Sequence, residues 1–342
     1  MNSMTMLLAL ILFSQLLVCF YKADPETGVV IDFGKESTMP LRGILCLGII
    51  LHHTYIWIFD VWGGVIVSVF FFLSGYGLVK SYKVKKDVYF QGYFRKKFEG
   101  IVLPFMISIV AFHIINFSFF KIPYETMLPA LFSGDTKIIL PTSWYIFAIS
   151  LVYIAYFLIA KVTCKIERQC LIMTILTLLF AVATKLCLNW DSHWRISALA
   201  LPIGVYVSCY EEKIISSIRL HYKLLVYSVS AIVLLMLLFA TDERLIQVNI
   251  YLAGVVVPIC TYLFFSVVGL NSILLKSIGS ISLEVYLVQG AVTMYLRLFI
   301  VNNYIYSFLS VLLSVTAGYL LWILKNAIIV KYKLYLSKLN NE

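Results

Sequence analysis

The sequence has few charged residues. Only 13% of its 342 residues are Asp, Glu, Lys or Arg, whereas 62% are hydrophobic. Because soluble domains average about a quarter charged residues, this composition excludes an ordinary soluble domain and indicates an integral membrane protein. The apolar runs are about 18 to 22 residues long, which favours transmembrane helices over the shorter alternating strands of a β-barrel.

The signatures of common soluble enzymes are also absent. The sequence contains no GxxxxGK[ST], no GxGxxG, no GxSxG and no HExxH, so no motif supports a P-loop nucleotide enzyme, a serine hydrolase or a zinc protease. The 7 Cys residues lie in or beside apolar runs, with no CxxC and no His at metal-ligand spacing. We therefore interpret them as small apolar residues and predict neither disulfides nor a metal site.

Positive charge is what the sequence has in excess, with 27 Lys and Arg against 17 Asp and Glu. A net charge of +10 is compatible with nucleic-acid binding, but here Lys and Arg cluster in alternate loops. Membrane proteins set their orientation by this pattern. We therefore predict a lipid bilayer as the surroundings of the chain and no nucleic-acid partner.

The apolar runs predict an all-α polytopic membrane bundle of about eleven transmembrane helices. If the most basic segment, 80–97, is cytoplasmic, inside segments carry twenty Lys and Arg, outside segments carry four, and three lie within spans. This bias places the N-terminus outside and the C-terminus inside. The expected spans are 4–21, 40–58, 61–79, 100–120, 143–160, 170–188, 195–210, 224–240, 245–267, 279–299 and 305–329.

We expect three parts along the chain. Residues 1–39 form an extra N-terminal transmembrane helix and a polar connector, 40–330 form the main membrane domain, and 331–342 form a cytoplasmic tail. Segment 4–21 lacks a basic region before it and a cleavage site after it, so we expect it to be retained. The long outer loop, 121–142, is of a length that is usually functional or disordered in a compact bundle.

Residues 41–55 carry ionisable side chains within an apolar run. Arg42 and His53 are eleven residues apart, which places them on one face of a helix, about 16.5 Å apart along its axis. His52 lies about 100° away from that line. Ionisable groups inside a spanning helix are costly and usually face a cavity or a partner, so they suggest function. The alternative is that Arg42 anchors the helix at the cytoplasmic edge and the two histidines end it.

Three further segments accompany LRGILCLGIILHH (41–53): FFFLSGYGLVKSY (70–82), TSWYIFAISLVY (142–153) and GSISLEVYLVQG (279–290). In this order they resemble the membrane-bound acyltransferase type 3 family, bacterial enzymes that acylate, most often O-acetylate, cell-surface glycans. The resemblance covers the ten spans after the first. It implies a ten-helix acyltransferase core to which the N-terminal helix is added.

The chain departs from that family at two places. An Arg-x-x-Arg pair usually precedes a proline at the entrance of the third family helix, but RKKFEGIVLP has Lys97 and Gly100 at those positions, with Arg95 and Lys96 just upstream. The late segment ends in Gln289, where many relatives have His. We therefore assign Gln289 no role in proton transfer.

The resemblance implies an O-acyltransferase of the bacterial inner membrane. Acetyl-CoA or another acyl-CoA is its expected donor substrate, and a hydroxyl of a cell-surface polysaccharide or of its lipid-linked precursor is the acceptor. No permanently bound cofactor is expected. Arg95, Lys96 and Lys97, with Arg42 nearby, are expected to bind the donor phosphates, a contact that suits arginine.

His53 and Arg42 are the expected catalytic residues. His53 is expected to act as general base on the acceptor hydroxyl, or to carry the acyl group as a covalent intermediate. His52 is the rival base, or a packing residue. Three secondary candidates have plainer alternatives: Ser74 for helix packing, Trp144 for an interfacial belt and Glu284 for solvation or pairing with an Arg or Lys.

Two other classes of protein remain open at this stage. A transporter or flippase of lipid-linked saccharides also suits eleven spans, although the internal repeats typical of transporters are not evident. A degenerate membrane scaffold is compatible with the missing second arginine and with Gln289. No residue selects the acceptor sugar, the hydroxyl position, the size of the acyl group or the oligomeric state.

Overall fold

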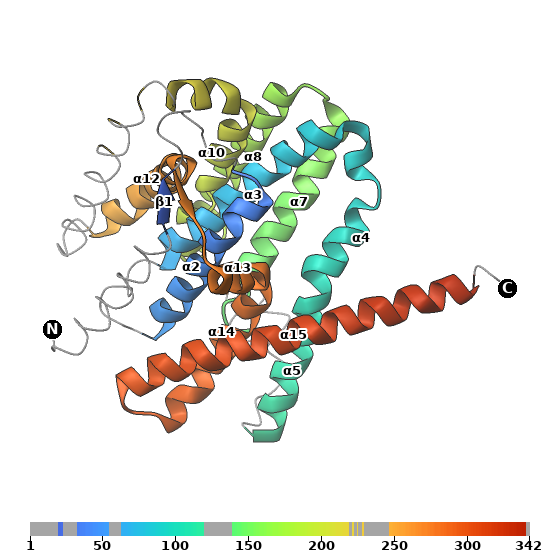
Figure 1. Cartoon of the computed structure of the whole chain (residues 1–342), viewed down its shortest axis with the longest axis vertical. Coiled ribbons are helices and arrows are strands. Elements are labelled where there is room, and N and C mark those ends of the chain that lie inside the picture. Colours follow the sequence, from blue (N-terminus) through green and yellow to red (C-terminus); the bar gives the residue numbers. More distant parts are fainter. Residues whose placement is uncertain are drawn as a thin grey trace.

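A computed structural model describes residues 20–22, 33–54, 63–119, 139–218, 221, 224, 228 and 246–339. Nearly all of these residues are helical, which confirms the all-α prediction for the described part of the chain (Figure 1). Its two strands, β1 (Phe20–Lys22) and β2 (Val268–Leu270), pair in antiparallel register. The expected spans 4–21 and 224–240 and the outer loop 121–142 lie almost entirely outside the described residues, and Phe20 and Tyr21 belong to β1.

The described helices keep the order of the expected spans. A 3₁₀ turn, η1, follows α3, and a π-helical turn, η2, joins α4 to α5. The elements are α2 (Lys35–His53), α3 (Gly63–Lys85), η1 (Lys86–Phe90), α4 (Tyr93–Lys97), η2 (Phe98–Val102), α5 (Leu103–Phe119), α7 (Trp144–Val162), α8 (Ile166–Leu186), α9 (His193–Ile196), α10 (Ala200–Cys209), α12 (Ile246–Val267), α13 (Ile273–Ser280), α14 (Ser282–Phe299) and α15 (Asn303–Leu339).

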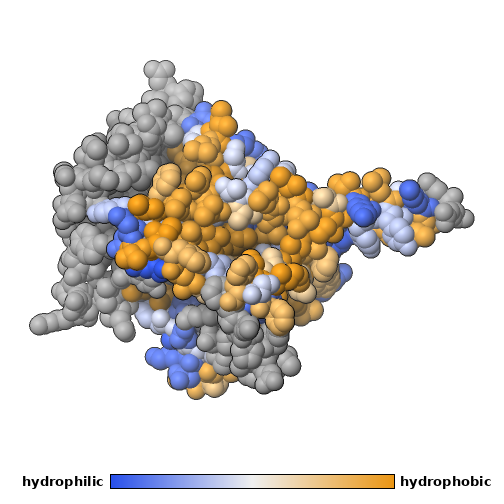
Figure 2. Space-filling view, turned by 90° about the horizontal axis from the view of Figure 1, so that it is seen from below, coloured by the Kyte–Doolittle hydropathy of each residue, from blue (hydrophilic) through white to orange (hydrophobic). Residues whose placement is uncertain are grey.

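Within the described residues, five helices are long and apolar enough to cross a membrane. α13 and α14 form a sixth if the pair, bent by 78°, is counted as one span. Figure 2 shows apolar side chains over much of the visible face, as expected where lipid replaces water. The protein is therefore a multi-pass membrane protein, while the total of about eleven spans and their orientation stay predictions.

Segment 195–210 differs from the single span expected there. It is divided into α9 and α10, and α10 has only 10 residues. Such a helix is about 15 Å long, too short for a hydrocarbon core of about 30 Å. The break lies at Ser197, whose hydroxyl donates to the Gly64 carbonyl oxygen at 2.9 Å. Pro202 then lies in the first turn of α10, where its missing N–H is tolerated.

α2 is fixed by a close crossing with α13. A Cβ added to Gly43 would lie 2.2 Å from the Leu275 carbonyl oxygen, and one added to Gly279 would lie 1.8 Å from that of Met39. Only glycine allows the two backbones to approach so closely. The crossing sets the position of Arg42, which lies next to Gly43 in the sequence.

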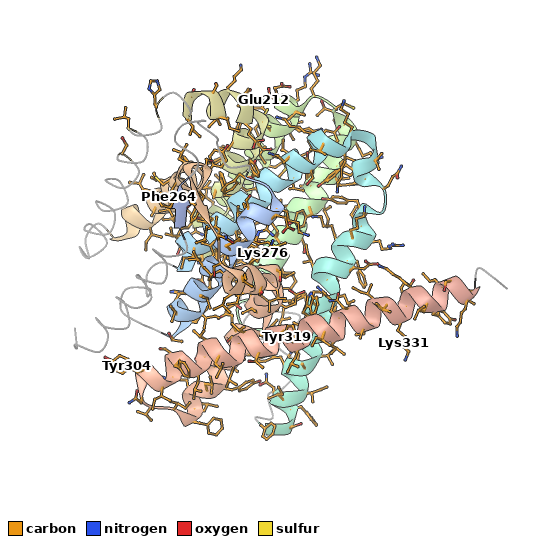
Figure 3. All side chains as sticks on the ribbon, in the orientation of Figure 1. Glu212, Phe264, Lys276, Tyr304, Tyr319 and Lys331 are labelled. Carbon is orange, nitrogen blue, oxygen red and sulfur yellow. The ribbon has the colours of Figure 1, made fainter. Side chains whose placement is uncertain are left out.

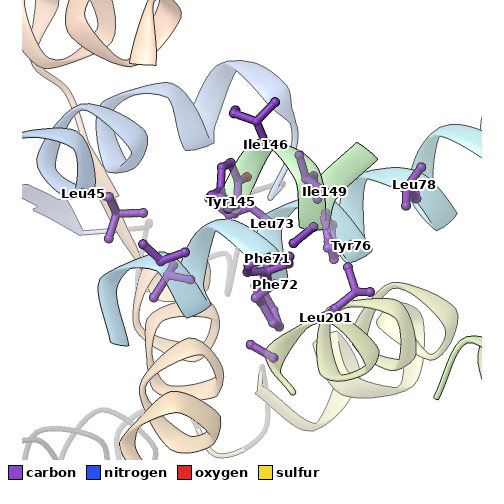
Figure 4. Close-up of a cluster of buried hydrophobic side chains, with 14 of the residues drawn as sticks. Leu45, Phe71, Phe72, Leu73, Tyr76, Leu78, Tyr145, Ile146, Ile149 and Leu201 are labelled. Carbon is purple, nitrogen blue, oxygen red and sulfur yellow. The ribbon is translucent and has the colours of Figure 1, made fainter. Parts of the chain in front are cut away.

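α3 runs through the centre of the bundle and packs against α10, α12 and α2. Its buried aromatic residues Phe71 and Phe72 meet Leu201 of α10, and α7 contributes Ile146 and Ile149 to the same cluster (Figure 4). Gly75 lets α10 approach, since a Cβ there would lie 2.4 Å from the Leu201 carbonyl oxygen. Ser74 and its neighbours are thereby held on a rigid central helix.

α15 is the longest helix. Its 37 residues span about 55 Å at 1.5 Å per residue. Its buried positions run from Tyr306 to Lys325, and beyond them the helix extends past the bundle (Figures 1 and 3). Figure 3 labels Lys331 on this extension and Tyr304 at the opposite end of α15. The helix therefore continues without interruption to Leu339, through most of the expected tail, 331–342.

Candidate functional site

A cavity of about 480 Å³ lies among α2, α3, α4, α7 and α14. Its wall on α3 runs from Val67 to Lys85, 18 residues further on. That is about 27 Å of helix, close to the thickness of the hydrocarbon core, about 30 Å. The cavity therefore follows the central helix over most of its length and brings together residues far apart in the sequence.

One end of the cavity is strongly cationic. Five lysines belong to its wall, and no acidic residue does within the described part of the chain. The Lys97 ammonium nitrogen lies 3.4 Å from the centroid of the Tyr153 ring and 5.4 Å from that of Tyr93, so cation–π contacts orient it. Burial raises the pKa of the neighbouring Tyr89 hydroxyl. The five lysines are Lys35, Lys80, Lys85, Lys96 and Lys97.

Of the three cations predicted to bind the donor phosphates, the structure brings two to the cavity. Lys96 and Lys97 line it, whereas Arg95 does not. The Arg95 side chain is 66% exposed, and its Nε lies 3.3 Å from Glu99 Oε1. Two residues of helix separate Arg95 from Lys97 by about 200°, so both cannot face the same side of α4.

At the other end, a few polar groups meet in apolar surroundings. Arg42, Ser74, Tyr145 and Tyr286 line the wall together with apolar side chains such as Phe70. The hydroxyl groups of Ser74 and Tyr145 interact with one another. Arg42 Nε is buried and has no hydrogen-bond partner among the described residues. A guanidinium carries only donors, so this group is suited to a carbonyl or phosphate oxygen of a ligand.

Both predicted histidines lie just beyond the described wall of the cavity. A Cβ on Gly63 would lie 2.3 Å from the His52 ring, and one on Gly48 would lie 3.1 Å from Ile66. These contacts show that α2 and α3 run antiparallel and that His52 packs against the start of α3. The wall on α3 ends at Val67, four residues after Gly63, or about 6 Å along the helix.

The structure thus joins Arg42, Ser74, Lys96 and Lys97 in one cavity. It places His53 near the Val67 end of that cavity, away from the lysines. His53 is half-buried, and its ring centroid lies 4.8 Å from that of His52. Arg42 and His53 remain linked through α2, which begins beside the cationic end and finishes at the imidazole.

The other two secondary candidates lie outside the cavity wall. Trp144 stacks on Phe71 with ring centroids 6.3 Å apart and lies 4.7 Å from the His193 ring. Glu284 forms a buried ion pair with Lys325 that joins α14 to α15. Pairing with a lysine was one of the alternatives expected for Glu284, and it is confirmed.

Several polar wall residues were not predicted from the sequence, among them Lys80, Tyr145 and Tyr286. Each of these three belongs to one of the four family-like segments, and this was the available signal. The Tyr286 hydroxyl donates to the Thr142 carbonyl oxygen at 2.8 Å. Thr142 has φ +67°, an uncommon backbone conformation that clusters at functional sites.

This geometry defines a class of protein: a multi-pass membrane protein with a cavity along its central helix that is cationic at one end. The sequence matches a family described as an acyltransferase domain over residues 41–325, which is 285 of the 342 residues. The chain therefore belongs to the acyltransferase type 3 family and is a membrane acyltransferase. No curated protein and no solved structure matches it.

Proposed function

We propose that this protein moves an acyl group, with acetyl as the favoured candidate, from cytoplasmic acyl-CoA to a hydroxyl of a cell-surface polysaccharide or of its lipid-linked precursor in the bacterial inner membrane. The observation that carries this proposal is the cavity, which links lysines on α3 and α4 to Arg42, on the helix that ends at His53.

The cationic end suits the donor. Acyl-CoA carries a diphosphate and a 3′-phosphate, and charge-assisted hydrogen bonds from Lys96 and Lys97 would hold these groups. The pantetheine arm is long and mostly uncharged, and it fits a wall of apolar side chains along α3. Arg42 would then donate a hydrogen bond to a carbonyl oxygen of the arm or of the acyl group.

The end of the cavity near His53 suits the transfer step. His53 removes the proton from the acceptor hydroxyl, whose oxygen attacks the thioester carbonyl carbon. The carbon–sulfur bond breaks, and the thiolate of CoA takes up a proton. A positioned base typically contributes about 10²–10⁴-fold to such a step. The packing of His52 against Gly63 supports His53 as the base, and an acyl-His53 intermediate is the alternative route.

The test uses membranes that contain the full-length protein, acetyl-CoA labelled in the acetyl group, and the surface polysaccharide of the host. We expect label to enter the polysaccharide as an alkali-labile ester, and to enter it only when the protein is present. Movement of unlabelled lipid-linked saccharide without ester formation would instead identify a flippase. If neither ester formation nor saccharide movement occurs, the protein is a scaffold.

A further inference from the structure

A buried polar cluster at the cationic end has no part in the steps above. Glu211 is only 9% exposed, and the Lys80 ammonium lies 2.8 and 3.0 Å from its two carboxylate oxygens. The Tyr76 hydroxyl donates to Glu211 Oε1, and its oxygen accepts from Lys80 at 3.2 Å. A buried carboxylate is costly unless it is paired and hydrogen-bonded, and here both conditions are met.

The cluster lies partly in the cavity wall and partly behind it. Lys80 and Tyr76 belong to the described wall, and Glu211 does not. The Lys80 side chain keeps 29% of its surface exposed. Its ammonium is therefore held from behind by a carboxylate and a hydroxyl while part of the side chain remains accessible.

Lys83, on the same helix, shows the contrasting arrangement. Its ammonium donates to the backbone carbonyl oxygens of Ser208 at 2.8 Å and Cys209 at 2.7 Å, where α10 ends. Lys83 is not part of the described cavity wall. Both lysines connect α3 to the end of α10, but only Lys80 also borders the cavity.

We propose that Lys80 binds a phosphate of the acyl donor and that Glu211 and Tyr76 are positioning residues that fix its ammonium for this contact. The inference rests on the proposed function, because it takes acyl-CoA as the ligand. A lysine side chain loses much rotamer freedom when it binds a ligand. Fixing the ammonium beforehand removes part of that cost and strengthens binding.

The test compares two donors, acetyl-CoA and acetyl-pantetheine, of which the second has the same thioester but no phosphate. For Lys80→Gln we expect KM for acetyl-CoA to rise about tenfold, equivalent to the loss of about 1.4 kcal/mol. We expect kcat for acetyl-CoA and both constants for acetyl-pantetheine to stay as in the wild type. Lys80→Arg, which keeps the charge, should recover most of the loss.

A second set of variants tests whether Glu211 and Tyr76 position Lys80. Glu211→Gln and Tyr76→Phe should raise KM for acetyl-CoA less than Lys80→Gln does, and neither should raise it further when Lys80 is already Gln. Lys83→Gln is the matched control, and its KM values for the two donors should equal those of the wild type. Equal changes of KM for both donors in Lys80→Gln, or no change for either, would overturn the proposal.

Direct binding separates this inference from the proposed function. Calorimetric titration of the purified, detergent-solubilised protein with CoA itself should show binding that Lys80→Gln weakens about tenfold. If that loss is seen but no acyl transfer occurs, the proposed function fails and the phosphate site stands. If the wild type and Lys80→Gln bind CoA equally, the phosphate site fails, whatever the transfer assay shows.

Discussion

The two ends of the cavity differ in how firmly their charged groups are held. At the cationic end, Lys80 has a buried carboxylate and a hydroxyl behind it, and Lys97 lies over an aromatic ring. At the other end, Arg42 Nε makes no described hydrogen bond. Under the proposed function, the lysines meet the same phosphates in every cycle and can be fixed in advance, whereas Arg42 has to stay available to a substrate group that changes during transfer.

The largest effect should come from the imidazole end. His53→Ala should reduce acyl transfer about 10²–10⁴-fold, because a positioned base is lost. Initial rates of ester formation in membranes measure this, with protein content checked by immunoblot. His52→Ala is the control, since His52 packs on Gly63. A His53→Ala variant as active as the wild type, or a larger loss in His52→Ala, would remove His53 from the mechanism.

A large effect on stability should come from the buried ion pair that joins α15 to α14, the helix that carries Tyr286 of the cavity wall. Lys325→Met leaves Glu284 unpaired between α14 and α15, and breaking a buried ion pair costs about 3–5 kcal/mol. The thermal midpoint in detergent should fall clearly. The matched variant Glu284→Leu with Lys325→Met removes both charges and should recover much of the loss. A Lys325→Met variant as stable as the wild type would show that the pair does not hold α14 and α15 together.

A smaller effect should come from the cationic end. Lys97→Gln should raise KM for acetyl-CoA about tenfold, the equivalent of one charge-assisted hydrogen bond, with kcat nearly unchanged. Arg95→Gln provides the contrast, because Arg95 pairs with Glu99 outside the cavity wall. If Arg95→Gln weakened donor binding more than Lys97→Gln, the cavity would not be the donor site.

The smallest effect should come from a charge pair outside the cavity. Lys276 lies 2.8 Å from Glu36, and this hydrogen-bonded contact lowers the pKa of the exposed Glu36 carboxyl. The pair therefore contributes at pH values above the ordinary pKa of a glutamate, and the contribution is lost as pH falls through the lowered value. Lys276→Gln should return that pKa toward its usual value, as carboxyl-selective NMR would detect, and leave acyl transfer intact.

Composition and periodicity were enough for the parts of this fold that depend on length and polarity. Helices α3, α5, α7, α8 and α15 are long apolar runs, and their positions follow from the sequence. The break in 195–210 and the bend of 78° between α13 and α14 do not follow, because hydropathy records how apolar a segment is and not its direction. Such breaks depend on contacts made by distant residues, such as Ser197 with Gly64.

The site, like the fold, has features that the sequence predicts and features that it does not. The placement of Arg42 and His53 on one helix, eleven residues apart, follows from the sequence alone. That Lys97 and not Arg95 reaches the cavity is also consistent with helical geometry, once the cavity is known. The presence of Tyr145, Tyr286 and Lys80 in one wall depends on how α3, α7 and α14 pack together, and no local pattern carries that information.

The end of the described cavity wall at Val67, before the level of His53, has a consequence for the cell. A passage open at both faces would let ions leak and dissipate the gradients that the cell maintains across its envelope. We therefore expect the region between Val67 and the histidines to keep ions from crossing while it lets the thioester approach the imidazole.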